Sequence, residues 1–283
     1  MVTIPCNLCG WNVGMQDIIY QGNEITLAQC PGCSLVFDID VNNEPQGKTN
    51  IGVHDGIDFY LERKNELVFQ EEIRRISKIS PPPGRLLDFG CGIGLFLKEA
   101  NSHGYDIYGI ELNRGAVDHI RKNALFPIFL TIEETTKQLG SCFFDIIVLN
   151  HTLEHVSDPL NVLSGLKKLL KPSGLIVVVV PYYNRLTRVI NRYYHFLIVK
   201  GHQFYFIEKT LTQYLVKTGF TDIEKKTPIM GGFAMRAFGD KLSIVAKKLI
   251  IKSLWMLLGI MRMVGLNINL TMYARKKEQA DED

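Results

Sequence analysis

An aspartate and three glycines lie close together near the middle of the chain, at the end of a short apolar run. The run, residues 85–89, is typical of a buried parallel strand, and residues 95–103 have the apolar spacing of a helix. Glycines in the turn between them let the backbone come close to a ligand. A dinucleotide-binding turn would carry glycine at position 95, where this chain has leucine. The residues of this turn that could contact a ligand are Asp88, Gly90, Cys91, Gly92 and Gly94.

Two carboxylates near this turn indicate which kind of ligand it would hold. Asp88 precedes the first glycine by two residues, and a carboxylate there suits an ammonium group better than phosphates. Glu111 ends the next predicted strand, 106–111, and follows Gly94 by 17 residues. A carboxylate at that strand end can accept the hydroxyls of a ribose. The alternatives are a tight turn without a ligand and an exposed glutamate.

Four cysteines near the N-terminus have the spacing of a metal site. They form two C-x-x-C pairs with 20 residues between the pairs, and a hairpin signal, Gln21-Gly22-Asn23, lies in the interval. Four thiolates close a tetrahedron around one zinc ion and leave no open position, which favours a structural role. We therefore predict a zinc ribbon over residues 1–40; a redox dithiol is the weaker alternative. The expected ligands are Cys6, Cys9, Cys30 and Cys33.

Strands and helices alternate through the rest of the chain, which predicts an α/β fold with a doubly wound sheet. Further strands are expected at 127–131, 143–150, 174–181, 220–227 and 267–275. Ligands of such sheets bind at the carboxyl ends of the strands, where the winding reverses. By this interpretation Asp88, Gly90, Glu111 and Asn150 all lie at those ends.

Two motifs resemble one known family. The turn has the pattern D-x-G-x-G-x-G, and residues 144–159 read F-D-x-I-x-x-x-H-x-L-E-H-V-x-D-P. Over about residues 84–235 the chain resembles class I S-adenosylmethionine-dependent methyltransferases, in particular the group that includes ubiquinone-biosynthesis O-methyltransferases. The resemblance implies a seven-stranded Rossmann-like sheet whose last strand inserts antiparallel at the edge.

The resemblance also implies how the cofactor is held. Ile132 and Glu133 follow the third strand, at the corner that holds adenine in the family, with the acid taking the exocyclic amine. The full set of expected contacts with S-adenosylmethionine is Asp88, Gly90, Cys91, Gly92, Gly94, Glu111, Leu112, Ile132, Glu133 and Asn150.

Three histidines are candidates for a general base. Methyl transfer needs the acceptor, methyl group and sulfur in line, and a base where the acceptor carries a proton. Histidine is the natural base near neutral pH. The candidates are His151, His155 and His202, and in the resembling family a histidine at the last of these places lies over the active site.

The H-x-L-E-H sequence leaves a second, metal-binding interpretation open. In the ubiquinone group, acids and a histidine of this region can hold a divalent metal beside the acceptor hydroxyl. Glu154 and His155 match that pattern, but His151 stands where the group has an acid, and this departure argues against a magnesium site. The alternative is that Glu154 and His155 cap the following helix and order the loop, and for Glu154 we favour that structural role.

Composition narrows the class of protein. The chain has 283 residues, 22% of them charged and 10% aromatic, which fits a globular protein and excludes a disordered one. A net charge of +3 gives no argument for nucleic acid. No signal peptide and no apolar run long enough to span a membrane are evident, so the expected location is the cytosol. Six cysteines there favour metal or structural roles over disulfides.

Two segments outside the sheet remain to be placed. We expect a linker at 41–55 and a helix at 59–79, which either covers the cofactor site or packs on the sheet. The chain then divides into a zinc ribbon (1–40), a linker with the leading helix (41–83) and a methyltransferase domain (84–283). A helix at 241–264 has a basic stripe and a broad apolar face containing Trp255. Such a helix can lie peripherally on a membrane, bind a lipid-linked acceptor, or pack against a partner or the protein itself.

The sequence therefore predicts a methyltransferase that modifies an oxygen of a small-molecule, sugar or lipid-linked acceptor. The alternatives are C- or N-methylation in sugar or natural-product assembly, and a non-catalytic module that retains the zinc ribbon and the cofactor-binding fold only to bind a partner. The glycine turn and Glu111 argue against the last of these.

Overall fold

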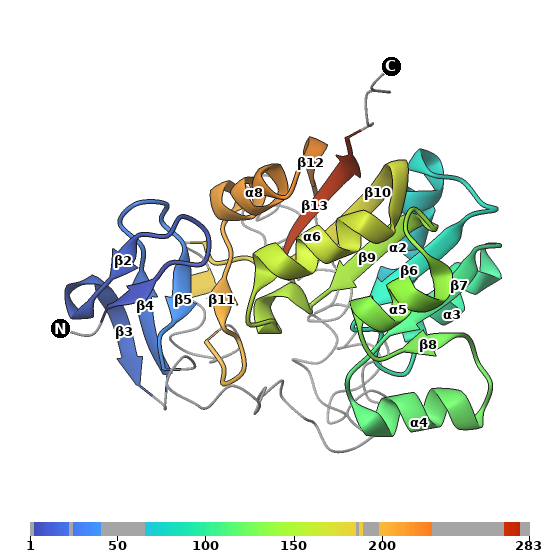
Figure 1. Ribbon diagram of the computed structural model, residues 1–283, viewed down its shortest axis with the longest axis horizontal. Helices are drawn as coiled ribbons and strands as arrows, with labels where there is room; N and C mark the ends of the chain where they lie inside the picture. The colour runs from blue at the N-terminus through green and yellow to red at the C-terminus, as the bar shows by residue number, and fades with distance from the viewer. Residues whose placement is uncertain are drawn as a thin grey trace, which may run out of the picture.

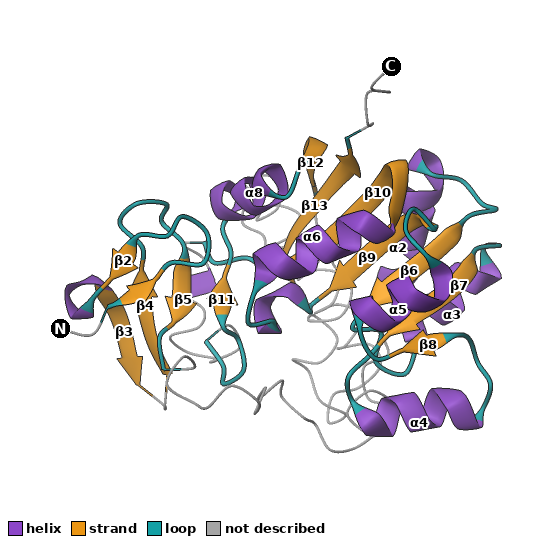
Figure 2. Ribbon diagram, viewed as in Figure 1, coloured by secondary structure: helices purple, strands orange, loops and turns teal. Residues whose placement is uncertain are grey.

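The structure is a computed structural model that describes residues 3–22, 25–40, 66–184, 187–188, 198–227 and 269–277. A seven-stranded sheet and a four-stranded sheet organise these residues, with a two-stranded hairpin beside the smaller sheet. Figure 1 places the N-terminal strands at one end of the molecule and the large sheet with its helices at the other. Figure 2 shows the same view coloured by secondary structure.

The large sheet confirms the predicted α/β fold. Its strand order is β12-β13-β10-β9-β6-β7-β8, and the five consecutive strands from β10 to β8 are parallel. β13 pairs antiparallel with both β10 and β12, so it lies one strand in from the edge and β12 forms the edge. The predicted antiparallel insertion of the last strand near the edge of the sheet is therefore confirmed. The strands are β6 (Arg85–Phe89), β7 (Asp106–Ile110), β8 (Ile128–Phe129), β9 (Phe144–Asn150), β10 (Leu170–Pro181), β12 (Phe220–Lys226) and β13 (Asn269–Lys276).

Helices cover both faces of this sheet because successive strand residues point to opposite sides. Leu87 and Ile147 belong to one buried cluster with residues of α6 and α8, whereas Leu86 and Ile146 belong to another with residues of α2 and α3. The helices are α2 (Glu66–Ile79), α3 (Leu95–Ser102), α4 (Arg114–Lys122), α5 (Ile132–Leu139), α6 (Pro159–Leu169) and α8 (Glu208–Lys217), with short 3-10 helices η1 (Met15–Asp17) and η3 (Leu153–His155).

The described part of the leading helix packs on the sheet. Ile73 and Ile76 of α2 are fully buried in the same cluster as Phe96 of α3. The hydroxyl of Tyr273 on β13 donates a 2.5 Å hydrogen bond to Glu72 of α2. Residues 66–79 therefore form a layer over β6 and β13, as expected if the predicted helix packs on the sheet. Residues 59–65 of that helix lie outside the described part.

The small sheet combines strands of the N-terminal segment with one strand from the second half of the chain. We call residues 3–22 and 25–40 the N-terminal ribbon. Its strands β3, β4 and β5 pair in order, and β11, from the second half of the chain, adds to β5 as a fourth strand. Figure 1 shows β11 lying beside β5. The strands are β1 (Ile4–Pro5), β2 (Asn12–Val13), β3 (Ile18–Gly22), β4 (Ile25–Gln29), β5 (Val36–Asp38) and β11 (Phe204–Tyr205).

Two predicted segments lie outside the described residues: the linker at 41–55 and the helix at 241–264. Among the described residues, no helix has the length and hydropathy needed to cross a membrane.

Candidate functional site

Asp88 lies on β6, the middle one of the five parallel strands, opposite Gly109 of β7 and Val148 of β9. Its side chain is buried, and its Oδ1 atom has no hydrogen-bond partner among the described residues. Burial, together with the nearby charge of Glu111, raises the pKa of the Asp88 carboxyl to about 8. A buried carboxylate without a partner is costly, so this position is suited to a ligand that brings a positive charge or a donor.

The glycine turn follows directly and adopts a backbone that side chains disfavour. Gly90, Gly92 and Gly94 have φ values of 81°, 55° and 82°. A Cβ on Gly90 would lie 2.5 Å from the hydroxyl oxygen of Thr152, and one on Gly94 would overlap the ring of Phe126. The turn thus needs glycine both for its conformation and for its close approach to the neighbouring loops.

Glu111 closes this turn from the end of β7. One carboxylate oxygen accepts a 2.8 Å hydrogen bond from Gly92 N, and the other accepts 2.8 Å bonds from the backbone N–H groups of Leu112 and Asn113. A carboxylate offers about four acceptor positions, so about one remains here. The side chain is buried and directed at the turn, as a ribose-binding carboxylate would be. If Glu111 accepted hydrogen bonds from two ribose hydroxyls, its hydrogen bond from Gly92 N would have to break.

The other predicted cofactor contacts occupy different environments. Cys91 is buried, whereas Leu112 is 52% exposed next to Glu111. Sequence reasoning missed Leu130, which is 38% exposed at the end of β8, the neighbour of β7. Together these leucines offer an apolar surface at adjacent strand ends, of the kind that a flat base could cover.

Ile132 and Glu133 begin α5. Ile132 packs toward Gly165 of α6, where an added Cβ would come within 3.2 Å of its side chain, and Glu133 is exposed. Asn150 ends β9, half-buried, next to the histidine sequence. We call Asp88, residues 90–94 and Glu111 the carboxylate half of the site.

His151 opens a second group of polar side chains at the end of β9. Its φ of 55° is unusual for a residue other than glycine, and such conformations often occur at functional sites. Its Nδ1 lies 3.4 Å from Glu154 Oε1, and its Nε2 lies 3.3 Å from the side-chain nitrogen of Asn269 on β13. Both ring nitrogens of His151 are thus engaged.

Glu154 is the buried centre of this group. Only 1% of its surface is exposed, and neither carboxylate oxygen has a hydrogen bond of good geometry among the described residues. Burial alone would raise the pKa of Glu154, but His151, His202 and His155 lower it overall, so the carboxylate is ionised. The predicted capping role is wrong: Asp158 caps α6, accepting a bond from Asn161 N.

His155 and His202 meet beside this carboxylate although 46 residues separate them in sequence. Their ring centroids are 4.8 Å apart. His155 Nδ1 donates to the carbonyl of Gly201 at 2.9 Å, which leaves Nε2 as the atom that faces Glu154 Oε1, 4.0 Å away. One ligand atom from each of Glu154, His155 and His202 lies within 4.8 Å of the others, a spacing compatible with sharing a proton or a cation. We call His151, Glu154, His155 and His202 the histidine half.

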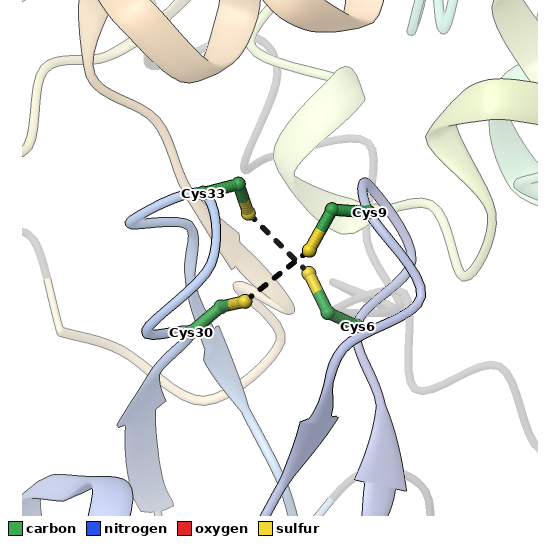
Figure 3. A group of neighbouring side chains, drawn as sticks. All are labelled: Cys6, Cys9, Cys30 and Cys33. Atoms are coloured by element: carbon green, nitrogen blue, oxygen red, sulfur yellow. Dashed lines mark hydrogen bonds between the residues drawn. The ribbon is translucent and has the colours of Figure 1, made fainter.

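The four predicted metal ligands converge in the N-terminal ribbon, as Figure 3 shows. The sulfur atoms of Cys6 and Cys33 are 3.6 Å apart, and those of Cys9 and Cys30 are 3.4 Å apart. These distances are far too long for disulfides and close to the roughly 3.8 Å between sulfurs around a tetrahedral zinc ion. Burial raises the pKa of Cys6 and raises that of Cys33 to about 11, so binding a metal here would release protons.

Comparisons with known proteins agree with this geometry. Residues 60–225, more than half of the chain, match the family described as "Methyltransferase domain". A ubiquinone biosynthesis O-methyltransferase of Actinobacillus pleuropneumoniae is 29% identical over 129 residues, which are 42% of this chain and 52% of that protein. The chain thus matches about half the length of this curated relative.

Two solved structures share the fold. A SAM-dependent methyltransferase from Archaeoglobus fulgidus has a TM-score of 0.55 and 23% identity, covering 77% of this chain and 99% of its own. The 1,6-didemethyltoxoflavin-N1-methyltransferase of Burkholderia thailandensis, solved with S-adenosylhomocysteine, has a TM-score of 0.52 and 14% identity, covering 93% and 100%. The family match, the strand order and the glycine turn lead to one conclusion. This chain belongs to the methyltransferase domain family and has the fold of class I S-adenosylmethionine-dependent methyltransferases.

Proposed function

We propose that this chain transfers the methyl group of S-adenosylmethionine to an oxygen of a small-molecule, sugar or lipid-linked acceptor. The observation that carries the proposal is the presence of two buried acids whose side chains have oxygens that accept no hydrogen bond among the described residues. Asp88 lies at the glycine turn, and Glu154 lies among three histidines at the end of the next strand, β9. The first suits a cationic cofactor, and the second suits an acceptor that must lose a proton.

In this proposal the carboxylate half binds the cofactor, which supplies an electrophilic methyl group when bound. Asp88 neutralises its positive charge, and Glu111 accepts from its ribose. The other predicted contacts, from Cys91, Leu112, Ile132, Glu133 and Asn150, surround the same strand ends. Leu112 and Leu130 supply the apolar surface for the base.

The histidine half takes the acceptor. His155 is the preferred base because the Gly201 carbonyl fixes its Nδ1 as a donor, which leaves Nε2 to accept the hydroxyl proton. The acceptor oxygen then bonds to the methyl carbon as the carbon–sulfur bond breaks and its electron pair stays on sulfur. Glu154 stabilises the imidazolium that results. His202 lies against His155 and contributes to the same wall, and His151 holds Glu154 from the other side.

Names of relatives favour oxygen as the nucleophile, since matching proteins of Actinobacillus pleuropneumoniae and Pasteurella multocida are ubiquinone biosynthesis O-methyltransferases. The histidine half agrees, because a hydroxyl acceptor needs a base more than an amine does. The names do not extend to the acceptor of this chain, which stays open among quinols, sugars and other hydroxyl compounds.

We also propose that the four cysteines hold one structural zinc ion. The sulfur distances and the absence of a fifth ligand among the described residues around them support this. Elemental analysis of the purified chain should give about one zinc per chain. A metal-free ribbon that keeps its fold would contradict it.

The function is tested by incubating the full chain with methyl-labelled S-adenosylmethionine and panels of quinols, sugar nucleotides and lipid-linked sugars. We expect label in one hydroxyl class and S-adenosylhomocysteine as the second product. His155→Gln should lower the rate by about two orders of magnitude while leaving cofactor affinity unchanged. The matched control is His103→Gln, which changes an exposed histidine at the C-terminal end of α3, the helix that starts at the glycine turn. A wild-type chain that does not bind S-adenosylmethionine would contradict the proposal.

A further inference from the structure

We propose that the N-terminal ribbon is the positioning element of the histidine half, so that its metal site sets the place of His155 and His202. The inference rests on the proposed function in one respect, namely that the histidine half binds the acceptor. Its geometry stands on three sets of contacts, which run from the ribbon sheet to the histidines.

The first contacts are main-chain hydrogen bonds between the ribbon and β11. Phe37 and Val36 of β5 pair with Phe204 and Tyr205. Asp38 N extends the pairing by donating 2.9 Å to the carbonyl of Gln203. The chain that carries His202 therefore enters the ribbon sheet one residue after that histidine, and cannot move independently of β5.

Gln203 supplies the second set of contacts. Its backbone N–H donates 2.8 Å to the carbonyl of Glu154, and its side-chain nitrogen donates 2.9 Å to the carbonyl of His155. Gln203 thus binds the ribbon through its carbonyl oxygen and binds η3 through its backbone N–H and its side-chain amide. Both sides of the histidine half, residues 153–155 and residues 201–203, meet at this one glutamine.

Side-chain packing forms the third set. Ile25, Leu27 and Val36 of the ribbon share a buried cluster with Tyr183, which follows β10, and with Tyr205 of β11. The Tyr205 ring lies 6.1 Å from the His202 ring, and its buried hydroxyl has no hydrogen-bond partner among the described residues. This face of the ribbon sheet thus packs behind the histidine half.

The ribbon is itself fixed from its other side. Asn7, between the first two cysteines, donates 3.0 Å to Asp158 and accepts 3.0 Å from the hydroxyl of Tyr214 on α8. Lys217 donates to the carbonyl of Leu8 at 2.5 Å. Because both C-x-x-C turns would wrap one ion, metal binding orders the loop that makes these contacts together with the strands that hold β11.

A simpler alternative is that the ribbon only adds stability. It makes a distinct prediction, because a stabilising ribbon would not change the histidine environment in a chain that is still folded. The experiment therefore reads the histidine rings directly and does not depend on knowing the acceptor.

We would record nuclear magnetic resonance spectra of ring-labelled histidine in the full chain, well below its melting temperature, for wild type and Gln203→Met. Methionine keeps the length of the side chain and removes its donor to His155. Gln138→Met, which removes an exposed hydrogen bond to Glu134 on α5, is the matched control. Chelation and then return of zinc tests the ribbon end of the same connection.

We expect the His155 and His202 signals to shift and broaden in Gln203→Met and on chelation, to return with zinc, and to stay unchanged in the control. S-adenosylhomocysteine affinity, measured by calorimetry, should change by less than about twofold in Gln203→Met, since the carboxylate half makes none of these contacts. Unmoved His155 and His202 signals after chelation and in Gln203→Met would overturn the inference. A wild-type chain that fails to bind S-adenosylhomocysteine would instead overturn the proposed function, and the histidine signals would still decide the role of the ribbon.

Discussion

The two halves of the site are built in different ways. The carboxylate half comes from one continuous stretch, β6, the glycine turn, α3 and β7, in which Asp88 and Glu111 are 23 residues apart. The histidine half comes from the end of β9, the segment before β11 and, behind them, the N-terminal ribbon. One half is assembled by local chain geometry, and the other by contacts between parts of the chain that are up to about 200 residues apart.

This difference predicts different sensitivities. The carboxylate half is supported by the parallel core of the sheet and should keep its shape when the ribbon is disturbed. The histidine half depends on interfaces between segments, so changes in the ribbon should reach it. The same difference suggests that cofactor binding and acceptor specificity can vary independently in chains of this architecture.

The largest effect should follow removal of the ribbon metal. Structural zinc sites contribute about 10 kcal/mol or more to the folding of small zinc peptides, so chelation should expose the ribbon and β11 to hydrogen exchange. Protection at residues 85–89 and 106–110 should persist. Exchange measured by mass spectrometry tests this, and an equal loss of protection across β6 and β7 would contradict the comparison.

Glu111→Gln should weaken S-adenosylmethionine binding by about tenfold or more, because a charged acceptor of the ribose and of Gly92 N is lost. Calorimetry measures the affinity. Asp106→Asn, which changes an exposed aspartate at the opposite end of the same strand, is the control and should bind normally. Unchanged affinity in Glu111→Gln would remove this residue from the site.

Asp88→Asn should change the pH dependence of stability. The Asp88 pKa is raised to about 8 in the folded chain, so between about pH 4 and pH 8 the folded state holds a proton that the unfolded state has released. Without cofactor, wild-type stability should therefore fall as pH rises through this window, by up to a few kcal/mol, and the asparagine variant should lack that fall. Urea unfolding at both ends of the window tests it.

The cofactor sharpens this test. A cation bound beside Asp88 favours the ionised carboxyl, so wild-type affinity for S-adenosylmethionine should rise with pH more steeply than that of Asp88→Asn. Parallel pH profiles for the two proteins, in stability and in affinity, would show that the Asp88 carboxyl does not titrate in this range.

The smallest effect is expected where the ribbon contacts α6. Asp158 caps this helix and also accepts from Asn7, so Asp158→Ala should lower the free energy of unfolding by about 1 kcal/mol, with cofactor affinity unchanged. A double-mutant cycle with Asn7→Ala measures the ribbon contact alone. Asp118→Ala, exposed within α4, is the control; equal losses in the two variants would mean that the cap carries no special weight.

The sequence predicts the carboxylate half well because its signals are local. An apolar run, three glycines and a strand-terminal acid specify a strand, a turn and a second strand, and these place Asp88 and Glu111 correctly relative to the turn. The cysteine cluster can be predicted equally well, because the spacing of the four cysteines is typical of a closed metal site.

The histidine half was less predictable for a physical reason. Nothing in the types or spacing of residues 201–206 indicates that β11 joins the ribbon sheet, because a two-residue strand has no periodicity to detect. The role of Gln203 depends on that pairing and has no sequence signal. Both Glu154 and Asp158 precede α6, and their sequence positions do not show which of them caps the helix. In the structure Asp158 is the cap, whereas Glu154 is buried.

The most direct test of the account is a crystal structure of the full chain with S-adenosylhomocysteine. The account predicts the ribose on Glu111, the amino-acid part of the ligand beside Asp88 at the glycine turn, and the sulfur directed toward His155 and His202. A ligand bound with its sulfur turned away from these histidines, or bound at another place in the molecule, would contradict the account.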